Sequence, residues 1–186
     1  LPVQLLWINL LTAGLLGTAL IFEPKEDGIM RRMPRDPAQP ILTPELLGRT
    51  ALVSALMAAG AFALFAWEQN RGAPIAEART IVVNLIIGVE AFYLLSCRTL
   101  NRALLTARLA PNGWIWVGIG ATALAQAAFT YLPLFGKLFH TPPITPSAWG
   151  RILMVGALVF IVVESMKSFA QRSEARARPR GVPGNR

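Results

Sequence analysis

The sequence has very little that could close a disulfide or hold a metal through soft ligands. Its 186 residues include one cysteine, Cys97, and one histidine, His140. A single cysteine excludes a disulfide within the chain and argues against a thiolate metal site built by this chain alone. His140 has no second histidine at a ligand spacing, so we assign it no role.

Charge is also scarce, because only 15% of the residues are charged while 54% are hydrophobic. The hydrophobic residues are gathered into runs about as long as a bilayer is thick, which is typical of an integral membrane protein. The net charge of +8 does not indicate nucleic-acid binding, since the Lys and Arg residues lie between the hydrophobic runs and at the C-terminus. We therefore expect the lipid bilayer, and no nucleic acid, as a partner.

Five segments are apolar enough to cross a membrane. Backbone polar groups in lipid must be satisfied within the segment, so these spans are expected to be helices. Aromatic rings that suit the headgroup region, Trp114, Trp116 and Tyr131, flank the fourth segment. The sequence predicts an all-α, polytopic transmembrane helical bundle with spans at about 1–22, 50–67, 80–97, 113–132 and 149–167.

The positive charges are distributed unevenly between the two sides of this bundle. Of the 18 Lys and Arg residues, 14 lie in the three segments on the side of the C-terminus, namely 23–49, 98–112 and 167–186. The positive-inside rule then places the N-terminus outside and the C-terminus in the cytoplasm. We expect a transmembrane domain over residues 1–168 and a basic, disordered cytoplasmic tail over 169–186.

Two linked motifs identify a family. The first is LLWINLLTAG in the first span, and the second is the loop FEPKEDGIMRRMPRDPAQPIL at residues 22–42, whose four prolines predict an extended connector. Together they resemble the stretch that joins the sixth and seventh transmembrane helices of P-type cation-transporting ATPases. The matching residues are Leu6, Trp7, Asn9, Leu10, Thr12, Gly14, Glu23, Pro24, Ile29, Met30, Arg31, Pro34, Arg35 and Pro37.

The resemblance implies that the chain supplies the sixth to tenth helices of a pump, in its membrane-embedded ion pathway. Asn9 and Thr12 would be cation ligands on one helical face, with Gly14 and Gly17 favouring local unwinding. Ala13 stands where calcium and sodium pumps carry a ligand Asp, so the ion is left open. The alternative for Asn9 and Thr12 is an interhelical hydrogen bond.

Glu90 is the only charged residue in the third span. Burying such a group in a membrane helix costs about 2.5–3.5 kcal/mol on insertion scales, so it should face the bundle interior and have a partner or a protonation role. The resemblance aligns it with an ion-binding carboxylate of the eighth helix of calcium pumps. We expect it to be a cation ligand with Asn9 and Thr12, and the alternative is a protonated structural carboxyl.

The loop after the first span would couple helix movement to a phosphorylation domain. The resemblance assigns this role to Glu23, Pro24, Met30, Arg31, Pro34 and Arg35. ATP and Mg²⁺ would bind cytoplasmic domains outside this chain, which, with the remaining helices of the pump, would be its partners. We expect no cofactor in residues 1–186.

Three other expectations follow from the sequence. Asn84 and Gln126 should make packing hydrogen bonds, and Arg151 and Glu164 should snorkel from the ends of the short apolar run 152–163. The chain has neither Met nor a basic segment before its first apolar run, so we expect part of a longer protein of the bacterial plasma (inner) membrane. The alternative function is a stand-alone, non-enzymatic membrane accessory or scaffold protein derived from such a pump.

No aspartyl-phosphate motif and no glycine-rich phosphate loop occur in the sequence. Purified residues 1–186 should therefore neither hydrolyse ATP nor form an acid-stable phosphoenzyme with labelled ATP. Incorporation of label above a heat-inactivated control would reveal a catalytic site within these residues.

Overall fold

The computed structural model describes residues 1–25, 34, 40, 42–99 and 111–177. All regular structure in this part is helical, which confirms the predicted all-α fold for these residues. The elements are α1 (Pro2–Asn9), a π-helical segment η1 (Leu10–Gly17), a 3₁₀ turn η2 (Leu20–Phe22), α2 (Pro44–Asn70), α3 (Ile75–Cys97), α4 (Gly113–Tyr131), α5 (Pro133–Phe139) and α6 (Pro146–Ala177).

Four helical stretches in the described part are long and apolar enough to cross a bilayer. They are the first span (Pro2–Phe22, which contains α1, η1 and η2), Leu46–Asn70, Ile75–Cys97 and Pro146–Phe169. α4 and α5 together make a fifth if they count as one span, which is bent by 78°. Pro133 begins α5, and its missing N–H explains the break. The predicted polytopic helical bundle is thus confirmed.

The ends of α2 are set by capping groups and not by charges. Thr43 precedes the helix and its Oγ1 accepts a hydrogen bond from the Leu46 N–H (3.3 Å), with Pro44 in the first turn. The helix ends before Gly72, whose φ of 80° favours glycine. α2 therefore extends beyond the expected range 50–67 at both ends.

α6 also extends beyond the expected span. It continues to Ala177, so the segment 169–186 that we expected to be disordered begins as a helix. Helical propensity explains this extension, because AQRSEARA contains three alanines and two arginines, which are strong helix formers, and no proline or glycine. Residues 178–186 lie outside the described part.

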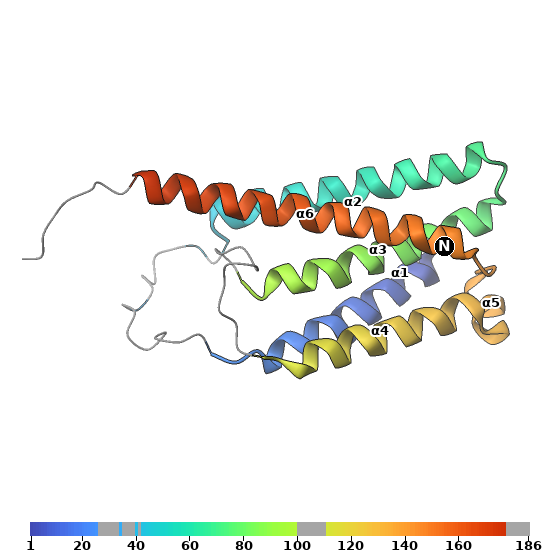
Figure 1. Cartoon of the computed structure of the whole chain (residues 1–186). Coiled ribbons are helices and arrows are strands. Elements are labelled where there is room, and N and C mark those ends of the chain that lie inside the picture. The colour runs from blue at the N-terminus through green and yellow to red at the C-terminus, as the bar shows by residue number, and fades with distance from the viewer. Residues whose placement is uncertain (26–33, 35–39, 41, 100–110, 178–186) are drawn as a thin grey trace, which may run out of the picture.

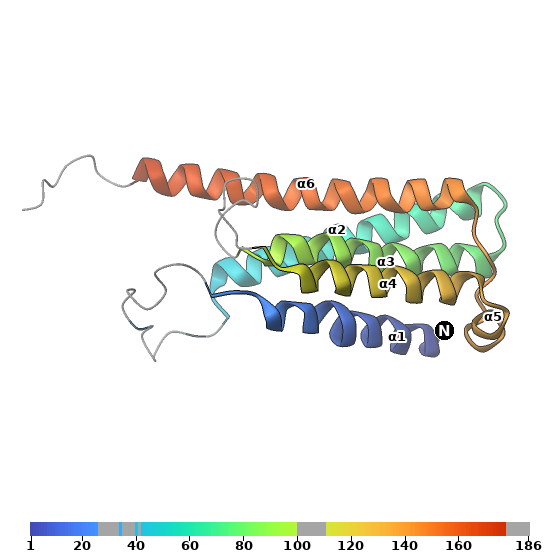
Figure 2. The same cartoon turned by 60° about the horizontal axis from the view of Figure 1, so that its bottom comes forward.

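α3 lies at the centre of the bundle. It packs against α6, α2 and the first span, while α4 packs mainly against the first span (Figures 1 and 2). The main core is formed where α2, α3 and α6 meet, and its buried side chains are Val53, Leu64, Ile81, Leu85, Val89, Ile144, Ala148, Ile152, Val159 and Val163.

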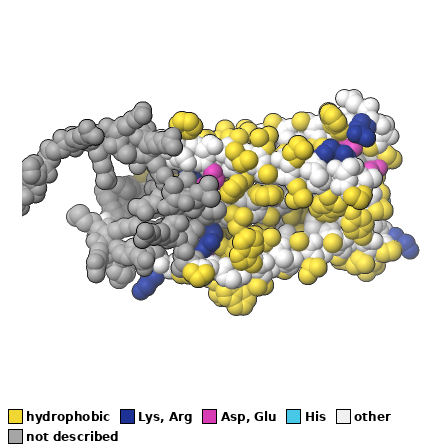
Figure 3. All heavy atoms as spheres, in the orientation of Figure 1, with side chains coloured by type: hydrophobic (Ala, Val, Ile, Leu, Met, Phe, Trp, Pro, Cys, Tyr) yellow, Lys and Arg dark blue, Asp and Glu magenta, His cyan; other side chains and the backbone are white. Residues whose placement is uncertain are grey.

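The outer surface of the bundle is apolar. Figure 3 shows hydrophobic side chains along the middle of the visible face, with Lys and Arg toward the two ends. Large exposed side chains such as Phe62, Leu124 and Met154 belong to this surface. A lipid environment explains their exposure, because hydrocarbon solvates them as well as the protein core would.

Close helix contacts depend on glycine at three positions. A Cβ on Gly118 of α4 would lie 2.8 Å from the Ala19 Cβ and 3.2 Å from the Leu15 carbonyl oxygen, both in the first span. A Cβ on Gly156 would lie 2.7 Å from Phe92 Cδ2, and one on Gly60 would lie 2.9 Å from Val155 Cγ1. Such close approach is how membrane helices gain packing energy without a hydrophobic driving force.

The orientation of the bundle in the membrane remains a prediction from charge. The N-terminus, the α2–α3 turn and α5 lie at one end of the bundle, and the C-terminal half of α6 points to the other (Figures 1 and 2). In a chain with Cys97→Ser, cysteines placed at the exposed positions Lys25 and His140 should react with an impermeant thiol reagent from opposite sides of sealed cells, with position 140 labelled from outside. Labelling of position 25 from outside would contradict the predicted orientation.

The contact at Gly118 can be tested against a matched position on the same helix. Gly118→Ala should lower the free energy of unfolding by about 1–3 kcal/mol, because overpacking forces the first span away from α4. Gly120→Ala should have no destabilising effect, since nothing lies within 4 Å of its added Cβ. Thermal unfolding in detergent measures both variants. Equal melting temperatures would show that the interface between α4 and the first span accommodates the added methyl group without loss of stability.

Candidate functional site

The first span changes its hydrogen-bonding pitch in its middle. Residues Leu10–Gly17 form a π-helix, which is wider than an α-helix and often occurs at functional sites. Glycine fits the wide turn, because a Cβ on Gly17 would lie 3.2 Å from the Thr12 carbonyl oxygen. We expected local unwinding near Gly14 and Gly17, and the structure has a widened helix there instead.

Thr12 and Glu90 are brought together from different helices. The Thr12 hydroxyl lies in η1 and contacts Glu90 Oε2 of α3, and it also lies 2.8 Å from the Ile8 carbonyl oxygen. A hydroxyl carries one proton. When that proton goes to the Ile8 carbonyl oxygen, the Thr12 oxygen can accept a hydrogen bond from a protonated Glu90; when it goes to Glu90, the carboxylate can be ionised.

This pair lines a cavity of about 330 Å³ between the first span, α2 and α3. Its lining is mostly apolar, but five of the lining side chains carry oxygen atoms, which are the ligands that hard cations prefer. The oxygen-bearing side chains are Thr12, Thr50, Ser54, Glu90 and Tyr93. The cavity can therefore offer one carboxylate and several neutral oxygens to a cation.

Asn9 is not part of this cavity. Its side chain is exposed on the first span, and Ala13 is exposed as well. Residues three apart lie farther apart around a π-helix than around an α-helix, and the π segment begins directly after Asn9. Among the predicted cation ligands, the structure thus joins Thr12 with Glu90 and leaves Asn9 on the bundle surface.

Glu23 anchors the C-terminal end of the first span. Arg98, directly after α3, donates to its Oε1 from both Nε (3.1 Å) and Nη2 (2.9 Å). Asn112 donates to Glu23 Oε2 (2.7 Å), while its own Oδ1 caps α4 by accepting from the Trp114 N–H (3.0 Å). One carboxylate thus joins the first span, α3 and α4, and Arg98 and Asn112 were not predicted as its partners.

The rest of the predicted coupling loop is described only in part. Pro24 and Pro34 are exposed, and neither has a cap or helix role. Met30, Arg31 and Arg35 lie outside the described residues.

The opposite end of the first span is held by an aromatic cluster. Trp7 Nε1 donates to Gln126 Oε1 of α4 (3.0 Å), and the indole stacks on Phe129 with ring centroids 5.3 Å apart. Gln4 Nε2 donates to the Phe139 carbonyl oxygen of α5 (3.0 Å). The expected packing hydrogen bond of Gln126 is therefore present.

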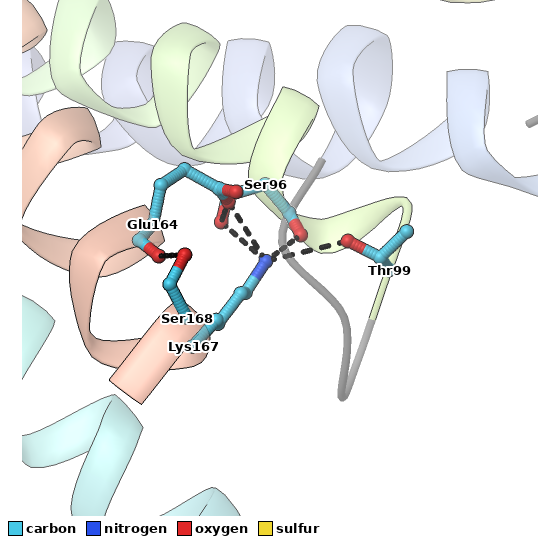
Figure 4. Close-up of polar contacts among 5 residues, drawn as sticks. All are labelled: Ser96, Thr99, Glu164, Lys167 and Ser168. Atoms are coloured by element: carbon cyan, nitrogen blue, oxygen red, sulfur yellow. Dashed lines mark hydrogen bonds and ion pairs between the residues drawn. The ribbon is translucent and has the colours of Figure 1, made fainter. Parts of the chain in front are cut away.

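Glu164 does not snorkel, which corrects our expectation. It is buried beside Lys167, whose Nζ lies 3.0 Å from Glu164 Oε1. Lys167 also donates to the Ser96 carbonyl oxygen (2.5 Å) and to Ser96 Oγ (2.6 Å), as Figure 4 shows. The ammonium thus caps the carboxyl end of α3 from α6. Removing one partner of such a buried pair typically costs on the order of 3–5 kcal/mol.

Arg151 also has a partner instead of snorkelling alone. Its Nη2 lies 2.5 Å from Glu68 Oε1, which joins the start of α6 to the end of α2. The two residues are far apart in the sequence, so no local spacing could reveal the pair.

No group of three or more His, Cys, Asp or Glu side chains placed to hold a metal ion occurs among the described residues. The Thr12–Glu90 cavity offers a single carboxylate, so a complete divalent-cation site needs further ligands from outside this part of the chain.

Comparison with known proteins identifies the family. Residues 1–169 match the family described as "Cation transporting ATPase, C-terminus". The chain is 53% identical over 163 residues to the "Probable cation-transporting ATPase F" of Mycobacterium tuberculosis, covering 88% of this chain and 18% of that protein. It is 31% identical over 160 residues to the "Cation-transporting ATPase pma1" of Synechocystis sp., covering 83% of this chain and 18% of that protein.

A more distant relative is the "Calcium-transporting ATPase 1" of Saccharomyces cerevisiae, which is 26% identical over 170 residues, covering 91% of this chain and 18% of that protein. The chain thus spans about a fifth of the length of these relatives. Its apolar helices and these matches make it an integral membrane protein. The chain belongs to the P-type cation-transporting ATPases and corresponds to their C-terminal membrane region.

Proposed function

We propose that the Thr12–Glu90 cavity is part of the transmembrane cation pathway of an ATP-driven pump. The observation that carries this proposal is the contact between a hydroxyl of a π-helical segment and a membrane carboxyl of another helix, at a mostly apolar cavity whose lining also includes Thr50, Ser54 and Tyr93. Ionisable side chains within a membrane span are energetically costly and are typically found where an ion or proton passes.

Glu90 would alternate between two partners in this mechanism. With a cation bound, the carboxylate and the Thr12 hydroxyl oxygen would both act as ligands. After release, a proton on Glu90 would restore a neutral cavity and donate to Thr12. This exchange avoids an uncompensated charge in a region of low dielectric constant.

The remaining ligands would come from helices of the pump outside residues 1–186. Asn9 and Ala13 are exposed on the face of the first span that those helices would cover. Asn9 would then be a ligand or a packing contact at that interface, and Ala13 would add no charge. The ion could be monovalent or divalent, because its charge balance depends on those other helices.

Glu23 would couple this site to ATP hydrolysis. It joins the end of the first span to α3 and α4 through Arg98 and Asn112. A displacement of the following loop would therefore be transmitted to three helices. Met30, Arg31, Pro34 and Arg35 in that loop would contact a cytoplasmic phosphorylation domain. ATP and Mg²⁺ would act on such domains and not on residues 1–186.

Substitution of Glu90 in the full-length pump tests the proposal. Glu90→Gln keeps the shape but removes the ionisable group, so apparent cation affinity should fall by about tenfold or more, equivalent to about 1.4 kcal/mol. Protons compete with the cation for the wild-type carboxylate, so wild-type affinity should fall as pH falls. The variant should lose that dependence. Cation-stimulated ATPase activity measured across pH gives both quantities.

Two matched variants separate a transport role from a structural one. Glu77→Gln removes a carboxylate in the first turn of the same helix, away from the cavity, and should leave affinity unchanged. Thr12→Val combined with Glu90→Gln should lower the apparent cation affinity by less than the sum of the two single effects in free energy, because the two residues bind the same cation. Wild-type affinity and pH profile in Glu90→Gln, with a lowered melting temperature, would make Glu90 a structural carboxyl.

A further inference from the structure

A cluster of buried polar side chains joins the C-terminal end of α3 to α6. Its members are Ser96 of α3 and Glu164 and Lys167 of α6. Figure 4 shows the Lys167 ammonium at the point where its interactions with Ser96, Thr99 and Glu164 converge. None of these residues lines the Thr12–Glu90 cavity, and neither does any other residue of α6. Lys167 can therefore influence that cavity only through the helices that it holds.

The side chains of this cluster form a closed ring of hydrogen bonds. The three hydrogens of the Lys167 ammonium have three close acceptors, which are the Ser96 carbonyl oxygen (2.5 Å), Ser96 Oγ (2.6 Å) and Glu164 Oε1 (3.0 Å). The Ser96 hydroxyl donates to the same Glu164 oxygen (2.5 Å). Because hydrogen bonds are directional, this ring forms only when the Ser96 side chain points toward α6.

The apolar contacts between α3 and α6 are less specific for one rotation of α3. Small residues allow the two helices to approach closely, since a Cβ on Gly88 would lie 3.2 Å from Ile152 Cγ2 and one on Gly156 would lie 2.7 Å from Phe92 Cδ2. Apolar attraction is non-directional, and hydrocarbon solvates the same side chains. The polar ring therefore specifies which side of α3 faces α6.

The rotation of α3 determines whether Glu90 faces the cavity. Glu90, Tyr93 and Cys97 line the cavity and lie on one face of α3. Ser96 is the residue before Cys97, and successive residues are about 100° apart around an α-helix. A rotation of α3 by one position would bring Ser96 to the cavity in place of Cys97 and would turn Glu90 away. Bonds that keep Ser96 on α6 therefore keep Glu90 directed toward Thr12.

The contact between Glu90 and Thr12 cannot fix this rotation by itself. The Thr12 hydroxyl has a second acceptor in the Ile8 carbonyl oxygen (2.8 Å). In the function proposed above, Glu90 also changes its partner when a cation binds or leaves. The ring on α6 contains no residue of the cavity, so it can stay intact throughout such an exchange.

We propose that Lys167 is a positioning residue for Glu90, an inference that rests on the cation role proposed for the cavity. Together with Glu164, Lys167 holds Ser96 on α6. This sets the rotation of α3 that directs the Glu90 carboxyl toward Thr12 and the bound cation. Lys167 itself does not contact the cation.

Lys167→Met in the full-length pump tests this proposal, because it keeps an unbranched side chain but removes the ammonium. Removal of a group that orients a metal ligand typically weakens affinity by about 10–100-fold, so the cation concentration for half-maximal ATPase activity should rise by at least that lower factor. The maximal rate at saturating cation should stay close to wild type, because the bound cation restores the ligand arrangement.

A matched control comes from the other ion pair of α6. Arg151→Met removes the cationic partner of Glu68, which joins α6 to α2 and not to α3. It should lower the melting temperature and leave the half-maximal cation concentration unchanged. The proposal is overturned if Lys167→Met also lowers only the melting temperature, or if both variants raise the half-maximal concentration equally.

A double variant shows whether Lys167 acts through Glu90. Lys167→Met should have little further effect on cation affinity in a Glu90→Gln pump, because the group that it positions is already lost. A full effect in that background overturns this inference alone. Wild-type affinity in Glu90→Gln by itself overturns the cation role of the cavity instead.

Ser96→Ala provides a milder test for the case in which Lys167→Met does not fold. It removes the hydroxyl from the ring and leaves the Ser96 carbonyl oxygen and Glu164 to the ammonium. The half-maximal cation concentration should rise in the same direction by a smaller factor. Wild-type affinity in Ser96→Ala, together with an unfolded Lys167→Met, would make the ring a purely structural contact and overturn the proposal.

Discussion

Hydrocarbon offers no hydrogen bonds, so each polar side chain between these helices needs a partner on a neighbouring helix. In α3 this requirement is met by hydrogen bonds to three other segments. Asn84 bonds to Thr130 of α4, Glu90 contacts Thr12 of the first span, and Ser96 bonds to Glu164 and Lys167 of α6. Each of these positions is six places after the previous one, which is about 240° around an α-helix. The three polar groups thus point in three directions, toward α4, the first span and α6, and they favour one rotation of α3 in the bundle.

The helical type of the spans and the positions of four of them could be predicted because long apolar runs are a property of the sequence itself, while the fifth depends on counting α4 and α5 as one bent span. Glu90 was also recognisable, since a lone carboxylate in an apolar span demands an explanation, and the family resemblance pointed to Thr12. The face of Asn9 was not predictable from an α-helical spacing, because the π segment alters the angle between residues. Its sequence signal, two glycines and a threonine, is shared with many ordinary membrane helices.

The polar contacts between distant segments were the hardest to predict. Glu164 and Lys167 stand three residues apart on one helix, which is a visible signal, yet the burial of the pair depends on Ser96 of α3. Glu68 and Arg151, and Glu23 with Arg98 and Asn112, meet only because the helices fold back on one another. A sequence shows which charges need partners, and only the packing shows where those partners are.

The π segment has a mechanical consequence that depends on how the first span is held. Its N-terminal end is fixed to α4 and α5 through Trp7 and Gln4, and its C-terminal end is fixed to α3 and α4 through Glu23. A helix held at both ends can neither slide nor tilt freely, but the segment between these contacts can still rotate about the helix axis. Conversion of π turns to α turns within Leu10–Gly17 would be such a twist, and it would swing the Thr12 hydroxyl away from Glu90 while both ends stay in place. A change of pitch within Leu10–Gly17 would therefore alter the distance between the Thr12 hydroxyl and Glu90 without moving either end of the first span.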